Sequence, residues 1–182
     1  MLHCVDAASE KFQSIFHYFC TNFKLKTMTD IIAIGKDRRT RPLVSELLEI
    51  WEASVRASHH FLTEDDILGL ATQAEGAMRN IETLWVLYDS RRAAGFMGVQ
   101  NRKIEMLFLH PDCFRKGLGK MLVKRAFRNL DVEYVDVNEQ NPDAVKFYER
   151  MSFKVFKRNE HDSEGNPFPI LEMKSSGECP DT

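Results

Sequence analysis

Apolar positions recur along this chain at two spacings, which separate the expected helices from the expected strands. Spacings of three and four residues predict helices over about 41–57, 63–79, 117–130 and 142–151. Short alternating or continuous apolar runs predict strands at 31–34, 83–89, 93–100, 103–110, 134–138, 153–160 and 167–174. The elements therefore follow the order β-αα-βββ-α-β-α-ββ, which is a mixed α/β (α+β) layered architecture.

Local capping and turn residues support these boundaries. Pro42 suits the first turn of a helix, and Thr63 is a favourable residue at a helix start. Asn101 and Arg102 lie between two predicted strands and indicate a tight turn. Gly165 lies at the centre of a predicted closing hairpin.

Residues 1–28 stand apart from the domain expected over 29–174. Within them, apolar side chains at helical spacing indicate one amphipathic helix: Phe12, Ile15, Phe16, Phe19 and Phe23. The segment is a surface anchor or docking helix, a helix packed on the domain, or an extension before a start at Met28. At the other end, small and polar residues predict a flexible tail over 175–182.

Composition limits the kind of protein. The chain has 182 residues, 43% of them hydrophobic, which suits one domain of ordinary size. A net charge of −2 argues against a protein that coats nucleic acid. No apolar run approaches the roughly 20 residues that a membrane helix needs. We therefore expect neither a nucleic-acid partner nor a membrane partner.

Cysteine usage points to a reducing compartment. The cysteines form no CxxC pair and lie at Cys4, Cys20, Cys113 and Cys179. Without that spacing, neither a zinc site nor a disulfide framework is expected. The N-terminus also lacks the early basic residues of a secretory signal. These features favour reduced thiols, no bound metal and a cytoplasmic location.

The segment 110–130 has the features of an anion site at a helix start. Gly117 and Gly119 follow a predicted strand, and glycines there let backbone N–H groups approach a ligand closely. Between Phe114 and Leu130 every charged side chain is basic: Arg115, Lys116, Lys120, Lys124, Arg125 and Arg128. A solvated helix with ordinary lysines is the plainer interpretation, but the strand, the glycines and the cationic helix together favour a phosphate site. Neither a Walker loop nor a dinucleotide fingerprint is present.

Two stretches carry a family resemblance. LFLHPDCFRKGLGKML and NPDAVKFYERMSF are similar to motifs of the GNAT superfamily of acyl-CoA-dependent N-acetyltransferases, over roughly residues 29–174. RASHHFL and VNEQN further resemble the small bacterial YjaB-type members. The resemblance implies a GNAT-type fold, with a central mixed, mostly antiparallel sheet. It also implies a V-shaped split between the strand of Glu105 and the strand of Tyr134.

The same resemblance implies acetyl-CoA as the co-substrate. Backbone groups of Leu107, Phe108 and Leu109 would hold the pantetheine arm, and Asn141 would bond it from the other side. The pyrophosphate would bind at Phe114, Arg115, Lys116, Gly117, Leu118, Gly119 and Lys120.

Two positions depart from the family pattern. Phe114 stands where the family usually has Arg or Gln, so the usual polar side chain is missing. Ser152 stands where the family usually has Gly, and we expect it to strain the end of the last helix.

The resemblance makes Tyr148 the general acid that meets the departing thiolate. Without the motif, Tyr148 is more simply a core aromatic residue beside Phe147. The general base stays open between Glu105, whose pKa burial among apolar neighbours would raise, and Asp136 on the facing strand. An exposed Glu105 opposite a cross-strand Lys or Arg is the alternative.

His59, His60 and Phe61 lie between the first two helices, in a loop that borders the acceptor site in this superfamily. A neutral imidazole there can act as a base or orient the substrate. A helix cap or loop packing explains adjacent histidines equally well.

The sequence therefore predicts transfer of an acetyl group from acetyl-CoA to a primary amine by direct attack, on a small molecule or a protein. Two other functions stay open. One is an acyl-CoA-binding or interaction module with little or no transferase activity, and the other is acetylation of aminoacyl-tRNA. The acceptor is not determined, and we expect a monomer or a homodimer.

Overall fold

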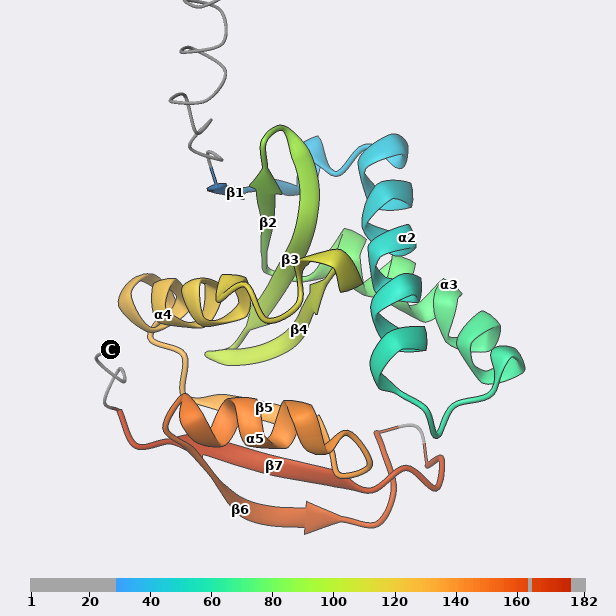
Figure 1. The fold of residues 1–182 in the computed structure, drawn as a ribbon, viewed down its shortest axis with the longest axis vertical. Helices are drawn as coiled ribbons and strands as arrows, with labels where there is room; N and C mark the ends of the chain where they lie inside the picture. The colour runs from blue at the N-terminus through green and yellow to red at the C-terminus, as the bar shows by residue number, and fades with distance from the viewer. Residues whose placement is uncertain (1–28, 164, 178–182) are drawn as a thin grey trace, which may run out of the picture.

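The structure, a computed structural model, describes residues 29–163 and 165–177 (Figure 1). The helix predicted within 1–28 and the tail residues 178–182 lie outside the described residues. The α-helices of this part are α2 (Arg41–Ser58), α3 (Glu64–Asn80), α4 (Leu118–Leu130) and α5 (Pro142–Arg150). The strands are β1 (Thr29–Ala33), β2 (Thr83–Asp89), β3 (Arg92–Gln100), β4 (Lys103–Leu109), β5 (Tyr134–Asn138), β6 (Phe153–Asn159) and β7 (Ile170–Ser175). Short 3-10 helices are η1 (Lys36–Arg38) and η2 (Pro111–Cys113).

The described strands form a seven-stranded sheet in the order β1-β2-β3-β4-β5-β7-β6 (Figure 1). Neighbouring strands are antiparallel except β4 and β5, which run parallel. The β4–β5 ladder contains only the pairs Lys103–Tyr134 and Ile104–Val135, after which the two strands part. The predicted mixed, mostly antiparallel sheet with a V-shaped split is therefore confirmed.

Two apolar cores lie on opposite faces of this sheet. Side chains of α2 and α3, such as Leu47, pack on one face, and side chains of α4 and α5, such as Leu122, pack on the other. Val86 and Leu87 are consecutive in β2 but belong to different cores, because successive side chains of a strand point to opposite faces. Burial on both faces explains why the central strands are continuous apolar runs in the sequence.

Local signals placed most boundaries correctly. Thr63 caps α3 in a reciprocal pair with Asp66: the Thr63 N–H donates to Asp66 Oδ2 over 2.8 Å, and the Asp66 N–H donates to Thr63 Oγ1 over 3.2 Å. Asn101 and Arg102 both have positive φ, at +50° and +63°. Two consecutive left-handed residues match the right-handed twist of the flanking strands, so the tight turn between β3 and β4 is confirmed.

The last connection differs from the prediction. β7 begins at Ile170, not at position 167, and continues through Ser175. Pro167 and Pro169 have no N–H to donate to a ladder, and Phe168 N–H bonds to Asn166 O over 2.8 Å. β6 and β7 pair antiparallel as predicted, but a loop longer than a tight turn joins them.

Ser152, the second residue after α5, has φ = +66°. This left-handed conformation is costly for a residue with a Cβ and free of that cost for glycine. The strain expected at this position is confirmed.

Arg39 is a buried charge that the sequence analysis did not single out. Its side chain is 6% exposed and reaches the C-terminal end of α3. Nη1 donates to the carbonyl oxygens of Met78, Arg79 and Ile81 over 3.2, 2.9 and 2.7 Å. The guanidinium thus satisfies carbonyls that a helix end leaves without partners.

Candidate functional site

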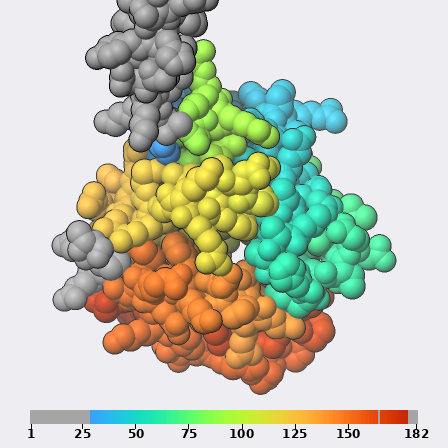
Figure 2. Space-filling view, viewed as in Figure 1, coloured from blue at the N-terminus to red at the C-terminus, as the bar shows by residue number. Residues whose placement is uncertain are grey.

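A cleft opens where β4 and β5 part. Beyond Ile104, β4 stays paired with β3 through Leu109, but its other edge has no partner in β5. The cleft has a volume of about 800 Å³. Figure 2 shows it as a hollow between the start of α4 in yellow, the end of α2 in cyan and the orange α5. Sequence segments far apart in the chain therefore form its walls.

The N-terminus of α4 forms the first wall. Gly117 precedes the helix with φ = +79°, and the first helical bond runs from Met121 N–H to Gly117 O over 3.0 Å. The N–H groups of Leu118, Gly119 and Lys120 therefore have no acceptor within the helix. A Cβ added at Gly117 would meet nothing within 4 Å, so the space beside this residue is open. This arrangement can hold an anion.

Gly119 brings α4 close to α5. A Cβ at Gly119 would lie 3.3 Å from Phe147 Cζ and 3.7 Å from Leu109 Cδ1. The second glycine of the motif therefore allows tight packing between the walls, whereas Gly117 permits the left-handed turn.

The cationic side chains around this wall are largely without carboxylate partners. Within residues 29–163 and 165–177, no ion pair involves Lys116, Lys120, Lys124 or Arg128. Positive charge is thus available to a phosphate ligand.

Arg115 and Phe114 occupy the loop before α4. Phe114 has an extended backbone and lines the cleft, where it offers no polar side-chain contact. Arg115 has φ = +59°, and its Nη2 lies 3.3 Å from Asp143 Oδ2 at the start of α5. Arg115 therefore places a guanidinium next to Phe114, the position at which the family usually has a polar residue and this chain does not.

Asn141 caps α5 and also faces the cleft. Its Oδ1 accepts the Ala144 N–H over 3.1 Å, and its own N–H bonds to Asn138 O over 3.0 Å. Its Nδ2 has no hydrogen bond with the described residues. Among those residues, every fully buried polar side-chain atom has a hydrogen-bond partner, so an atom without one is not fully buried. Nδ2 is therefore accessible, and the residue lines the cleft.

Tyr148 of α5 also lines the cleft. Tyr148 is only 7% exposed, and the centroid of its ring lies 5.0 Å from that of Phe147 and 5.5 Å from that of Phe153. The hydroxyl forms no hydrogen bond with the described residues and, by the same reasoning, is open to the cleft. Burial raises the pKa of the phenol, so Tyr148 stays a neutral donor.

Glu105 and Asp136 lie outside this cleft lining. Both carboxylates contact Lys103 Nζ, over 3.2 and 2.9 Å. Burial lowers the pKa of Lys103, but bonding and attraction to the two carboxylates outweigh that effect and raise it overall.

Of the two alternatives for Glu105, the structure agrees with the exposed one, because its side chain is 36% exposed, and its basic partner Lys103 lies on the same strand and not across the sheet. A β-bulge gives β4 one extra residue between the pairs Gly98–Met106 and Val99–Ile104, and Glu105 is that residue. Its buried neighbours Ile104 and Met106 produce the apolar context that suggested burial.

The loop between α2 and α3 forms the third wall. His59 and His60 line the cleft, and Phe61 packs against His59 at 5.5 Å and Phe168 at 5.6 Å. Burial, and then the nearby His60, lower the pKa of His59 to about 4. Phe168 connects this loop to the β6–β7 connection, a contact that the sequence did not reveal.

Ser58 is a second residue that the sequence analysis missed. Its hydroxyl donates to Ser54 O over 2.7 Å and lies 2.9 Å from His59 Nδ1. A serine four residues after another serine, next to a histidine at a helix end, was the available signal.

Two further observations concern the described part of the chain. It contains no group of three or more His, Cys, Asp or Glu side chains that can hold a metal ion. No helix in it is long and apolar enough to span a bilayer.

The fold, the split sheet and the glycine-rich helix start define an acyl-CoA-type transferase site, and the chain belongs to the acetyltransferase (GNAT) domain family, which it matches over residues 51–175. It is an N-acetyltransferase. The peptidyl-lysine N-acetyltransferase YjaB of Escherichia coli strain K12 is 34% identical over 151 residues, which cover 81% of this chain and 99% of that protein. The YjaB of Salmonella typhimurium strain LT2 is 38% identical over 138 residues, covering 75% and 94%.

Solved structures agree in fold. The solution structure of apo YjaB from Escherichia coli superposes with a TM-score of 0.72 at 32% identity, covering 83% of this chain and 99% of that chain. The structure of yncA from Salmonella typhimurium with its cofactor acetyl-CoA has a TM-score of 0.56 at 15% identity, covering 86% and 98%. The second likeness concerns the fold alone.

Proposed function

We propose that this protein transfers an acetyl group from acetyl-CoA to the primary amine of a lysine side chain in a peptide, by direct attack, with Tyr148 as the general acid. One observation carries the proposal. A single cleft is lined both by the start of α4, whose first N–H groups have no partner in the helix, and by Tyr148, whose phenol is accessible. One cleft therefore offers donors for a phosphate group and a hydroxyl that can serve a reacting thioester.

The residues present suit acetyl-CoA. The pyrophosphate would face the N–H groups of Gly117, Leu118, Gly119 and Lys120, with Arg115 and Lys116 supplying charge. The open edge of β4 from Leu107 through Leu109 would pair with the amides of the pantetheine arm, in place of a β5 ladder. The accessible Nδ2 of Asn141 would bond the arm from the opposite wall. When bound, acetyl-CoA supplies the activated acetyl group as a thioester.

Tyr148 assists departure of the thiolate. An ordinary phenol has a pKa near ~10 and a thiol near ~8.5, so complete proton transfer is uphill by about 2 kcal/mol. Burial raises the pKa of Tyr148 further. Tyr148 therefore acts by donating a hydrogen bond as negative charge develops on sulfur.

The acceptor amine must be neutral to attack. For a lysine-like amine of pKa ~10.4, deprotonation at pH 7 costs roughly 4–5 kcal/mol. If Glu105 or Asp136 is the base, water has to carry the proton, because neither carboxylate lines the cleft and Lys103 binds both.

The relatives support a peptidyl-lysine acceptor, since both YjaB proteins carry that name. We propose that the acceptor approaches along the wall formed by His59 and His60, next to which Phe61 packs against Phe168. An acyl-CoA-binding module without transfer is the second candidate, because Phe114 removes a polar contact from the phosphate loop.

A thiol-release assay with the full chain, acetyl-CoA and a panel of lysine peptides and small amines tests the proposal. Transfer to lysine peptides above the rate with small amines supports it. Calorimetric binding of acetyl-CoA without release of thiol would favour the binding module.

A matched pair of glycine variants tests the phosphate wall. Gly117→Ala places a Cβ on the left-handed residue that precedes the donors, which disfavours this conformation, and we expect the KM for acetyl-CoA to rise about 10-fold or more. Gly76→Ala in α3, where an added Cβ meets nothing within 4 Å, is the control and should leave KM unchanged.

A further inference from the structure

The hydrogen bonds around His59 determine which ring nitrogen carries its proton. Ser58 Oγ lies 2.7 Å from Ser54 O and 2.9 Å from His59 Nδ1. A carbonyl oxygen can only accept, so the single hydroxyl proton of Ser58 goes to Ser54. The Ser58 oxygen is then an acceptor toward His59, and Nδ1 must carry the proton that it donates. The neutral ring consequently has an unprotonated Nε2.

Nε2 is accessible at the cleft. It forms no hydrogen bond with the described residues, and among those residues no fully buried polar side-chain atom lacks a partner. His59 lines the same cleft as Tyr148. Its Nε2 lone pair is therefore a hydrogen-bond acceptor at that cleft.

The surroundings keep the ring neutral. Burial is the larger cause and the charge of His60 the smaller cause of a pKa of about 4 for His59. His60 itself is exposed and forms no hydrogen bond among the described residues that would select one of its tautomers. Of the two histidines, His59 is the one with a defined acceptor atom.

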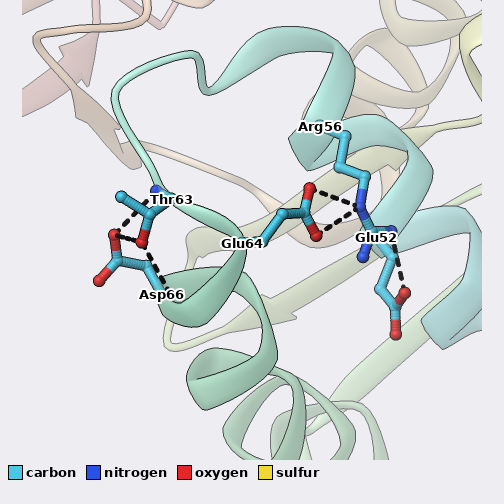
Figure 3. A network of polar contacts seen from close by, with 5 residues as sticks. All are labelled: Glu52, Arg56, Thr63, Glu64 and Asp66. Carbon is cyan, nitrogen blue, oxygen red and sulfur yellow. Dashed lines mark hydrogen bonds and ion pairs between the residues drawn. The ribbon is translucent and has the colours of Figure 1, made fainter.

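Both ends of the loop that carries His59 are held (Figure 3). At the first end, Arg56 of α2 contacts Glu52 over 3.0 Å and Glu64 of α3 over 3.1 Å. At the second end, Thr63 and Asp66 form the reciprocal cap of α3. Within the loop, His59 N–H bonds to Val55 O over 2.7 Å. These contacts hold the loop that carries the imidazole without a bound ligand.

We infer that Ser58 holds His59 as the Nδ1–H tautomer, so that Nε2 accepts a hydrogen bond from the acceptor amine and orients its lone pair toward the thioester. The inference rests on the proposed transfer to a primary amine. His59 contacts the substrate, whereas Ser58 is a positioning residue that acts through His59. A primary amine meets this requirement, because it keeps an N–H for Nε2 while its lone pair attacks, whereas a tertiary amine has none.

Nitrogen NMR on the full-length protein without ligands tests the tautomer independently of any activity. The chain has six histidines, and the resonances that disappear in His59→Gln identify this ring. We expect a protonated Nδ1 and an unprotonated Nε2 at pH 7, and a mixture of tautomers in Ser58→Ala. A protonated Nε2 in the wild-type protein overturns the inference, whatever the enzyme transfers.

Two replacements of His59 test the acceptor role. The amide oxygen of Gln lies near the position of Nε2, whereas the amide of Asn lies near Nδ1. His59→Gln should keep the KM for the amine within about 3-fold, and His59→Asn should raise it about 10-fold or more, with the affinity for acetyl-CoA unchanged in both. Equal KM values for the two variants overturn the inference.

Two controls distinguish an unfolded variant from a failure of the proposed function. Thermal unfolding shows whether each variant is folded. If the wild-type protein binds acetyl-CoA but acetylates no amine, the proposed function fails, while the NMR result still decides the tautomer.

Discussion

The guanidinium of Arg115 and the carboxylate of Asp143 join the two walls of the cleft, with 3.3 Å between Nη2 and Oδ2. Arg115 lies in the loop before α4 and Asp143 in the first turn of α5. Both side chains are largely exposed, at 86% and 78%, so the pair contributes little to stability. The ion pair matters for ligand binding, because a phosphate at α4 would compete with Asp143 for the guanidinium of Arg115.

Asp143→Asn should therefore tighten the binding of CoA. Removing the competing carboxylate frees Arg115 for the phosphates. Because an exposed ion pair is weak, we expect the Kd for CoA to fall by about 2- to 5-fold. Isothermal titration with CoA at low salt measures it, with Glu49→Gln on the exposed side of α2 as a charge-matched control. Unchanged or weaker binding would show that Arg115 does not contact the phosphates.

Tyr148→Phe should lower kcat by about 100-fold or more, the usual contribution of an acid–base group. The change removes only the hydroxyl, which has no hydrogen bond to the described residues, so Tm and the affinity for acetyl-CoA should stay the same. Steady-state thiol release together with calorimetry gives both values. An unchanged kcat would remove Tyr148 from the mechanism.

Ser152→Gly should stabilise the fold. The residue has φ = +66°, and relief of the left-handed strain raises the free energy of unfolding by about 1 kcal/mol. Ser45→Gly at an exposed position of α2 is the matched control and should lower it by about 0.5 kcal/mol, because glycine disfavours a helix interior more than serine does. Urea unfolding of the two variants should thus give shifts of opposite sign.

Arg39→Ala should destabilise the fold by about 3 kcal/mol, because it leaves buried carbonyl oxygens of the α3 terminus without donors. Arg38→Ala, at the exposed neighbouring position, should change the free energy of unfolding by less than about 0.5 kcal/mol. Similar midpoints for the two variants in urea would contradict the capping role of Arg39.

His59 should make the fold sensitive to acid. Its pKa is about 4 when folded and ~6.5 when unfolded, so the unfolded chain takes up the proton first as pH falls. Stability is therefore lost between pH 6.5 and 4, by about 3 kcal/mol in total from this group. His59→Gln should flatten the dependence of the urea midpoint on pH in that window. Parallel curves for the two proteins would contradict the burial of a neutral imidazole.

The sequence predicted much of this architecture. Apolar periodicity found the helices and strands, and Pro42, Thr63 and the Asn101–Arg102 turn marked boundaries correctly, because capping and turn preferences act within a few residues. The glycine-rich helix start was recognisable for the same reason. The cytoplasmic location and the oligomeric state stay predictions.

Several features depended on contacts between distant segments. The apolar neighbours of Glu105 suggested burial, but the bulge in β4 depends on the register with β3. In the sequence, nothing distinguishes Arg39 from the other basic residues. Its carbonyl partners lie at the end of α3, about 40 positions later, and only the fold brings them together. Phe168 meets Phe61 only because two loops converge at the cleft.

The sequence by itself determined which elements form, where an anion-binding helix begins, and which tyrosine follows the last helix start. These properties depend on the spacing of neighbouring residues, which survives in any short segment. The tertiary structure alone decided that β4 and β5 part, that Nδ1 of His59 faces Ser58, and that Tyr148 and the α4 donors share one cleft. Strand register, burial and the choice of a proton position depend on groups brought together from distant parts of the chain, so no local pattern encodes them.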